Sequence, residues 1–202
     1  MIPKNIISIW IGGDMPELVK GCVATHKLEG YNHIWVDNGT STDDLELDDL
    51  SKKYIKDCIE ARRYAKAVDF LRMVYLERYG GIYLDSDIEV LKNFDDVLDT
   101  QMFVCTEANG FVSNAVVGAI PHHPLIQEYL RTVKTNFLGS GDLVFQPGMQ
   151  LWTEFTKYRQ WGSEIKNYSP EWFLPYDHQT GKTNITENSH TIHHFLKSWL
   201  PK

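Results

Sequence analysis

Cysteines are scarce in this sequence and show no metal-binding pattern. The three present, Cys22, Cys58 and Cys105, are widely spaced and form neither a CxxC pair nor a Cys/His zinc motif. An odd number of scattered cysteines argues against a disulfide framework. We therefore expect reduced thiols that pack as small buried hydrophobic groups, in a reducing compartment.

Long apolar runs are also missing. The N-terminal stretch MIPKNIISIWIGG is far shorter than the roughly 20 residues that cross a bilayer, and it has no cleavable signal pattern. No other window is long enough, and no basic amphipathic helix predicts membrane docking. We expect a soluble, cytoplasmic protein, at most peripheral at the inner face of the plasma membrane.

Positive charge is in deficit, with 20 Lys and Arg against 27 Asp and Glu, a net charge of −7. This balance argues against nucleic-acid binding, which needs clustered basic residues, and is compatible with a carboxylate-lined metal site. There are no repeats or low-complexity linkers, and 43% of the 202 residues are hydrophobic. We expect one domain over residues 1–202.

Hydrophobic periodicity predicts an α/β domain. A short apolar strand over residues 5–11 precedes a helix that we expect to start at an Asp14 cap and run to about residue 28, and a second strand follows at 31–37. Strand–helix–strand with short connections indicates a parallel sheet. The further elements expected are a long helix over 61–79, strands over 82–84, 114–119 and 191–195, and helices over 124–135 and 149–158.

Two aspartates follow directly after the strand at 82–84. In an extended chain Asp85 and Asp87 would point to the same side, and ligands bind at the carboxyl ends of strands in open α/β sheets. Two close carboxylates repel each other unless a cation lies between them, and Mg²⁺ or Mn²⁺ suits oxygen ligands. An ordinary polar turn after a strand remains the alternative interpretation.

The preceding helix carries charge on its apolar face. Arg72 falls inside the apolar arc and Asp69 lies at its edge, three residues away. A charged group on a buried face needs a partner, and residues three apart on a helix can pair. The two therefore form either a structural ion pair or part of a polar ligand site beside the DxD strand.

Two weaker signals lie at the ends of the chain. Trp10 stands next to Gly12-Gly13, where backbone approaches closely, and is either a core residue or a stacking surface for a base. Near the other end, His190, His193 and His194 lie within five residues. A neutral imidazole is a good ligand for metals such as Mn²⁺.

The block ARRYAKAVDFLRMVYLERYGGIYLDSDIEVLKNFDDVL resembles the sugar-binding, DxD-containing region of glycosyltransferase family 32. That family includes bacterial capsular and surface polysaccharide transferases and yeast Golgi mannosyltransferases. The segments IPKNIISIWIGG, NAVVGAIPHHPLI and IHHFLKSW are similar to its first strand, its middle segment and its C-terminal motif. The resemblance implies a GT-A type, Rossmann-like α/β fold with a mostly parallel central sheet flanked by helices.

The resemblance also implies site roles. The residues nearest the chemistry would be Asp69, Arg72, Asp85 and Asp87. Donor-binding residues would be Trp10, Asp69, Arg72, Asp85, Asn114, Ser198 and Trp199. A Mn²⁺ or Mg²⁺ ion would be held by Asp85, Asp87 and His193, with His194 as the alternative imidazole.

The implied activity is metal-dependent, retaining transfer of a hexose from a nucleotide sugar. UDP-sugars are favoured and GDP-mannose is the second choice, with a saccharide or lipid-linked saccharide of surface polysaccharide or glycolipid synthesis as acceptor. One alternative is a phosphatase or phosphotransferase of the haloacid dehalogenase type, with the first aspartate of DxD as nucleophile and Asp95-Asp96 as a second acidic pair. Another is a nucleotide-sugar-binding module without turnover. The oligomeric state is not predicted.

Overall fold

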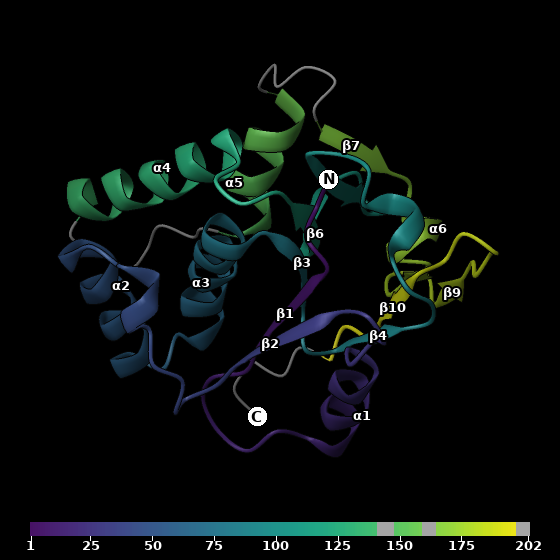
Figure 1. The fold of residues 1–202 in the computed structure, drawn as a ribbon, viewed down its shortest axis with the longest axis horizontal. Coiled ribbons are helices and arrows are strands. Elements are labelled where there is room, and N and C mark those ends of the chain that lie inside the picture. The colour runs from purple at the N-terminus through teal and green to yellow at the C-terminus, as the bar shows by residue number, and fades with distance from the viewer. Residues whose placement is uncertain (141–147, 159–164, 197–202) are drawn as a thin grey trace.

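The computed structural model describes residues 1–140, 148–158 and 165–196. Its central sheet has six strands in the order β2-β1-β3-β6-β5-β7 (Figure 1). Neighbours are parallel in the pairs β1–β2, β1–β3 and β5–β7, whereas β6 runs antiparallel to β3 and β5. The six strands are β1 (Asn5–Ile9), β2 (Asn32–Val36), β3 (Gly81–Leu84), β5 (Met102–Thr106), β6 (Val112–Ala119) and β7 (Ile165–Tyr168). The expected mostly parallel sheet flanked by helices is confirmed.

Helices cover one face of the sheet, and shorter elements cover the other (Figure 1). The first layer contains α2 (Asp49–Glu60), α3 (Tyr64–Tyr79), α4 (Pro124–Ser140) and α5 (Met149–Thr153). The second contains α1 (Glu17–Thr25), α6 (Pro170–Phe173) and two small antiparallel pairs. One pair joins β4 (Ile88–Val90) to β10 (Thr191–His193), and the other joins β8 (Tyr176–Asp177) to β9 (Lys182–Thr183).

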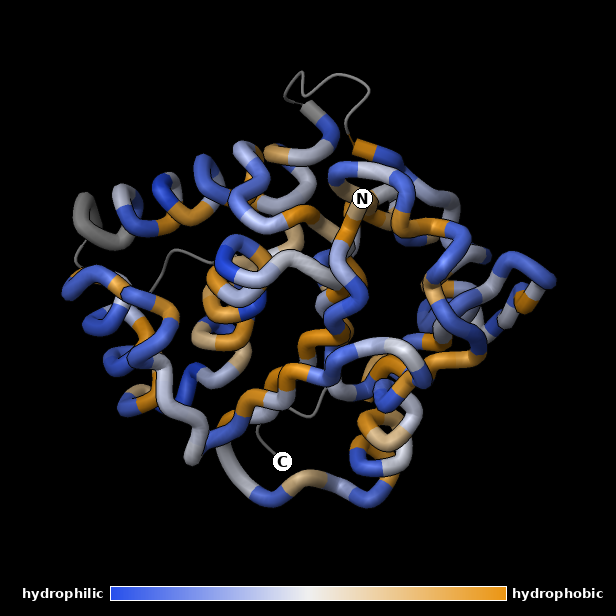
Figure 2. The backbone as a smooth tube through the Cα atoms, in the orientation of Figure 1, coloured by the Kyte–Doolittle hydropathy of each residue, from blue (hydrophilic) through white to orange (hydrophobic). Residues whose placement is uncertain are grey.

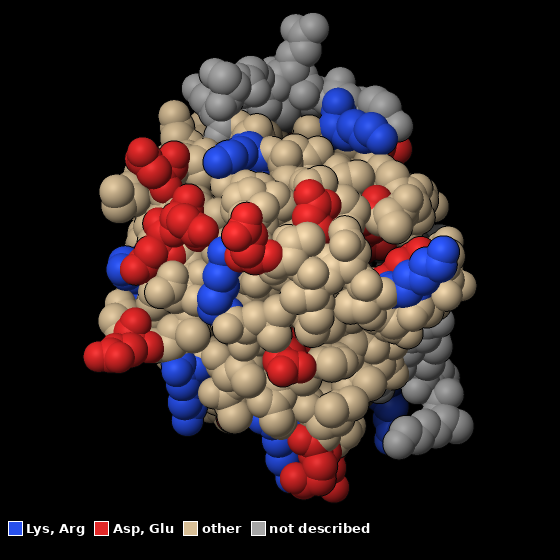
Figure 3. All heavy atoms as spheres, turned by 90° about the vertical axis from the view of Figure 1, so that its right-hand side faces the viewer, with Lys and Arg blue, Asp and Glu red and all other residues tan. Residues whose placement is uncertain are grey.

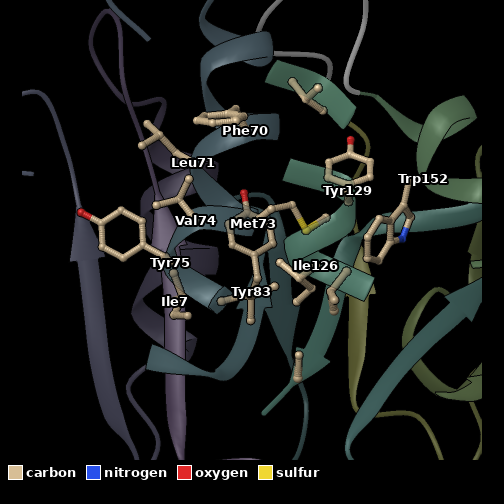
Figure 4. Packing of buried hydrophobic residues seen from close by; sticks show 14 of the residues in the cluster. Ile7, Phe70, Leu71, Met73, Val74, Tyr75, Tyr83, Ile126, Tyr129 and Trp152 are labelled. Atoms are coloured by element: carbon tan, nitrogen blue, oxygen red, sulfur yellow. The ribbon is translucent and has the colours of Figure 1, made fainter. Parts of the chain in front are cut away.

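Strand alternation divides the core into two clusters. Ile7 and Tyr83 face the α2–α4 side, where they pack with α3 (Figure 4), whereas Ile6 and Ile82 face the opposite cluster. Figure 2 shows the same pattern as hydrophobic stretches along the central strands, with hydrophilic stretches in the outer loops. The polar residues that follow the buried strands therefore lie at the edge of the sheet, where they can form a site.

Several predicted boundaries were wrong. The first helix begins at Glu17, after Pro16, and ends at Thr25, and no side chain caps its start, so the expected Asp14 cap does not form. The segment before the long helix, for which no element was predicted, folds as α2, and the long helix begins at Tyr64 rather than at residue 61. The strands at β4, β5 and β7 were also not predicted, because they are short or lack clear alternation. The helix expected over 149–158 divides into α5 and a π-helical turn over 154–158.

The structure can be compared with the expectations about the cysteines, membrane-spanning segments and surface charge. Cys22, Cys58 and Cys105 are all free and buried, as predicted. Within the described ranges, no helix combines the length and apolarity that crossing a membrane requires. On the face shown in Figure 3, acidic and basic side chains are interspersed, and no continuous basic patch is visible. That face therefore gives no indication of a polyanion-binding surface.

Candidate active site

Two glycines connect α3 to β3, the strand that leads into the DxD segment at the edge of the sheet. Helix α3 ends at Gly80 and turns into β3 through Gly81, whose φ of +118° lies in the region that favours glycine. A Cβ atom at Gly81 would lie 2.5 Å from the backbone oxygen of Asn5 on β1, so this close strand contact requires glycine. The fully buried β3 then ends at Leu84, immediately before Asp85.

The two aspartates converge through a turn, not through an extended strand. The backbone N–H of Ile88 donates to the carbonyl of Asp85 at 2.9 Å, which closes the turn over residues 85–88. The sequence-based expectation of a persisting strand is therefore wrong in its geometry. The carboxylates of Asp85 and Asp87 nevertheless lie on the same side.

A histidine from the far end of the chain completes the cluster. Ligand atoms of Asp85, Asp87 and His193 all lie within 4.8 Å of one another, and His193 Nε2 is 3.1 Å from Asp87 Oδ1. The pairing of β10 with β4 places His193 opposite Ile88, next to Asp87. The backbone N–H of Leu196 donates to Asp87 Oδ2 at 2.9 Å, so the segment after β10 also holds this carboxylate.

The pKa values of Asp85, Asp87 and His193, called the triad below, depend on one another's charges. Burial alone would raise the pKa of Asp87, but the hydrogen bond and charge of His193 outweigh it and hold that pKa below its usual value. Burial lowers the pKa of His193, yet Asp87 and Asp85 together raise it overall. Burial also raises the pKa of Asp85, against the opposing charge of Arg72. A second cation near these carboxylates would stabilise their ionised forms.

His193 and His194 lie in different environments. The Nδ1 atom of His193 is buried and has no hydrogen-bond partner among the residues that the structure describes. His194 Nε2 instead pairs with Glu89 at 2.9 Å. The geometry thus brings His193, not His194, to the two aspartates. Two carboxylates and an imidazole are a suitable donor set for Mn²⁺ or Mg²⁺.

Arg72 is the centre of a buried polar network beside the triad. Its guanidinium lies 2.9 Å from Asp69 Oδ1 and 3.2 Å from Asp85 Oδ1. It also donates to the carbonyl oxygen of Asn114 at 2.6 Å, and the Asn114 side chain donates to Asp69 Oδ1 at 3.0 Å. The predicted pair on one helix face is therefore present, and it connects α3, β3 and β6.

Tyr83 is a site residue that the sequence reasoning missed. Its hydroxyl donates to Asp85 Oδ1 at 2.8 Å, and the Arg72 guanidinium lies 4.6 Å from its ring centre. Figure 4 shows its ring among the core side chains between α3 and the sheet. The signal was available, because Tyr83 lies two positions before Asp85 and shares its face of the strand.

Asp69, which pairs with Arg72, is the remaining ionisable group of this network. Burial raises the pKa of Asp69 to about 6, although the charge of Arg72 opposes the shift. A carboxylate with a raised pKa and a buried guanidinium beside a cluster of metal-binding side chains are features of a candidate functional site. The arrangement suits a ligand with both phosphate and hydroxyl groups.

Comparison with known proteins decides the family. Residues 16–104 match the model for the glycosyltransferase sugar-binding region containing the DXD motif. This range includes the Asp69–Arg72 pair and the aspartates at 85 and 87. Residues 16–104 thus carry the sugar-binding region of DXD-containing glycosyltransferases. The resemblance noted from the sequence is confirmed, and the family favours a transferase over the phosphatase alternative.

Curated relatives of this transferase include fungal and viral proteins. It is 25% identical over 201 residues to mannosyl phosphorylinositol ceramide synthase CSH1 of Saccharomyces cerevisiae, covering 89% of this chain and 49% of the relative. It is 27% identical to the uncharacterized glycosyltransferase L373 of Acanthamoeba polyphaga mimivirus, covering 78% and 67%. The transferase thus spans about half the length of the yeast relative.

Solved structures agree on the fold. The PaToxG glycosyltransferase superposes with a TM-score of 0.62 at 23% identity, covering 76% of this transferase and 67% of that chain. The UDP-bound glycosyltransferase domain of the YGT toxin gives a TM-score of 0.53 at 12% identity, covering 79% and 67%. The expected glycosyltransferase fold is therefore confirmed.

The remaining predicted donor residues of the transferase are placed unevenly. Trp10 follows β1, and its indole N–H donates to the carbonyl of Gly13 at 2.8 Å. It thus lies at the same edge of the sheet as the carboxyl ends of β1 and β3, which run parallel. Asn114 is part of the Arg72 network. Ser198 and Trp199 lie outside the described residues.

Proposed function

We propose that this glycosyltransferase is metal-dependent and transfers a hexose, with retention of configuration, from a nucleotide sugar to a saccharide or lipid-linked saccharide. The observation that carries the proposal is the convergence of Asp85, Asp87 and His193 within 4.8 Å, from segments far apart in the chain. The family match supports transfer of a sugar, and the triad adds the argument for a metal.

The chain's own residues divide the work. Asp85, Asp87 and His193 would hold Mn²⁺ or Mg²⁺, which when bound acts as a Lewis acid towards the negative charge that develops on the leaving diphosphate. The Arg72 guanidinium, in contact with Asp69 and Asp85, keeps both carboxylates oriented. Its positive charge also favours the negative phosphates of the donor, so we expect Arg72, with Asp69, to help hold the donor sugar and its phosphates.

Asp69 is placed to hold the donor sugar. Its Oδ2 atom lies beside Gly148, 3.7 Å from the position that a Cβ atom would take there. Its other oxygen is held by Arg72 and Asn114. Because these contacts constrain Asp69, we expect the leaving phosphate, rather than a carboxylate nucleophile, to assist attack on the same face of the sugar by accepting the acceptor's proton.

Two donors deserve direct comparison. The UDP-bound structural neighbour supports a UDP-sugar as the first choice. The names of the yeast relatives, mannosyl phosphorylinositol ceramide synthases, support mannose as the transferred sugar and a glycolipid as the acceptor in those proteins. A GDP-mannose donor is therefore the second choice for this chain.

The cellular setting is part of the proposal. Three buried free thiols suit a reducing compartment, so we propose a cytoplasmic protein, at most peripheral at the inner face of the plasma membrane. We also propose that residues 1–202 act as one catalytic domain.

Donor hydrolysis tests the proposal. The purified chain would be incubated with a panel of UDP- and GDP-sugars, with Mn²⁺, with Mg²⁺ or with chelator, and release of the nucleoside diphosphate measured. The variant Asp87→Asn removes a proposed metal ligand. Asp57→Asn, on the surface of α2 and paired with Lys53, is the matched control.

Slow, metal-dependent hydrolysis of one donor, lost in Asp87→Asn and kept in Asp57→Asn, would support the proposal. Hydrolysis that persists with chelator or in Asp87→Asn would refute the metal role. Failure to hydrolyse or bind any nucleotide sugar would contradict the transferase activity. Turnover of a phosphomonoester instead would favour the phosphatase alternative.

A further inference from the structure

Strand β4, which follows the DxD segment, is held along both of its edges. One edge pairs with β10, so that Glu89 lies opposite Ile192. The other edge meets the C-terminal end of α1. There, the N–H of Val90 donates to Thr25 Oγ1 at 2.8 Å, and His26 Nε2 lies 2.7 Å from the carbonyl oxygen of Ile88.

The environment of His26 fixes its tautomer. A carbonyl can only accept, so Nε2 must carry the proton and donate to Ile88. Burial lowers the pKa of His26 to about 4, although the Ile88 carbonyl opposes the shift, so the ring is neutral near pH 7. Its Nδ1 then accepts from the hydroxyl of Ser8 at 2.6 Å, and Ser8 Oγ lies 3.3 Å from His33 Nε2.

These bonds form a directed chain across the second face of the sheet. It runs from His33 on β2, through Ser8 on β1, to His26 after α1, and ends on β4. His26 is fully buried, as is Ser8. A buried, fully bonded chain of this kind fixes the position of its last member, because each bond lost would leave an unpaired polar group in the interior.

The last member of the chain adjoins the proposed metal ligands. Ile88 immediately follows Asp87 and lies opposite His193 in the β4–β10 pair. Asp87 and His193 are 3.1 Å apart, so a small displacement of β4 changes the spacing of the donor atoms. Substituting groups that orient metal ligands from outside the coordination sphere typically lowers metal affinity about 10- to 100-fold.

We infer that His26 is a positioning residue of this transferase, holding β4 so that Asp87 meets His193 in metal-binding geometry. This inference rests on the proposed metal site. It assigns to a buried histidine far from the DxD segment in the sequence a role in the spacing of the ligands, which is separate from a general contribution to stability.

Three variants separate the two roles. His26→Leu removes both hydrogen bonds, whereas His26→Gln keeps an N–H donor near the position of Nε2. His123→Leu is the matched control, because His123 is also fully buried but lies just before α4, at the opposite end of β3 from the aspartates. Each variant would be measured for thermal stability, for Mn²⁺ affinity in the presence of UDP, and for hydrogen exchange of the β4 amides.

A positioning role predicts a specific pattern. Mn²⁺ affinity should fall roughly 10- to 100-fold in His26→Leu, recover to within about threefold of wild type in His26→Gln, and stay at the wild-type value in His123→Leu at comparable loss of stability. The amide of Val90 should exchange faster in His26→Leu than in the other proteins.

Other outcomes overturn the inference. If His26→Leu is folded and binds Mn²⁺ as tightly as wild type, or if His123→Leu loses as much affinity, His26 only contributes to stability. If the wild type binds no Mn²⁺, the proposed metal site is refuted. Hydrogen exchange of the β4 amides then tests by itself whether His26 holds this strand. Unchanged protection of β4 in His26→Leu would show that His26 does not hold this strand.

Discussion

Removing the buried arginine gives the sharpest test of the site's electrostatics. Arg72→Met keeps the length and apolar stem of the side chain but removes its charge. Asp69 and Asp85, at 2.9 and 3.2 Å from the guanidinium, then lose their counter-charge, although their side chains are only 19% and 25% exposed. Only 6% of the Arg72 side chain is exposed, so water cannot replace it without rearrangement.

The expected loss of stability is large for a single substitution. Removing one partner of a buried ion pair costs about 3–5 kcal/mol in the free energy of unfolding. For a chain of this size each 1 kcal/mol lowers Tm by about 2–4 °C, which gives a decrease of roughly 6–20 °C. Arg78→Met is the matched control, because Arg78 pairs at 3.2 Å with the exposed Glu46. An exposed pair contributes only about 0–1 kcal/mol.

The loss of stability in Arg72→Met should be larger at high pH than at low pH. The pKa of Asp69 is raised to about 6 in the folded protein, against about 3.9 in an unfolded chain. The stability linked to its protonated form is therefore complete below about pH 4 and is lost as the pH rises through about 6. Since Arg72 opposes this rise in pKa, Arg72→Met should extend the loss to higher pH.

Urea unfolding at pH 5 and at pH 8 measures both effects. The stability deficit of Arg72→Met relative to wild type should be larger at pH 8, where both carboxylates are forced to ionise. The reasoning fails if Arg72→Met is as stable as Arg78→Met. It also fails if the deficit is equal at the two pH values, because the deficit would then not arise from buried carboxylates.

Three further substitutions test single contacts. Tyr83→Phe removes the hydroxyl that donates to Asp85, so Mn²⁺ affinity should fall roughly tenfold; calorimetric titration that shows wild-type affinity would contradict this. Asp87→Asn should lower the pKa of His193, because Asp87 raises it; an NMR titration with an unchanged pKa would contradict the pairing. Gly81→Ala places a Cβ 2.5 Å from a backbone oxygen, so urea unfolding should show a loss of about 1–3 kcal/mol; a stability equal to wild type would refute that close contact.

Sequence patterns predicted the parts of the site that depend on local periodicity. The Asp69–Arg72 pair follows from helical spacing, and the position of Asp85 follows from a buried strand that ends in polar residues. These features need only neighbours along the chain, so a single sequence contains the information. The same reasoning predicted the parallel pairing of β1 and β2, because a helix with short connections lies between them.

Other parts depend on contacts that no local pattern encodes. The β4–β10 pair joins two three-residue strands from distant segments, and neither is long enough to show alternation. The choice of His193 over His194 depends on this pairing, since adjacent strand residues face opposite sides. Helix α2, by contrast, was missed although Leu50, Tyr54, Ile55 and Cys58 have the spacing of an amphipathic helix and Asp48 caps its start, so the signal was present in the sequence.

The β4–β10 pairing also bears on how the chain acquires activity. The hydrogen bond from Leu196 to Asp87 spans 109 positions of the sequence, so the triad closes a very long loop. Bringing such distant segments together is entropically costly, and contacts of this kind form late in folding. An incompletely synthesised or partly folded chain would therefore present two aspartates without their histidine. Metal affinity would appear only when the last strand docks, and the bound ion would in turn oppose its release.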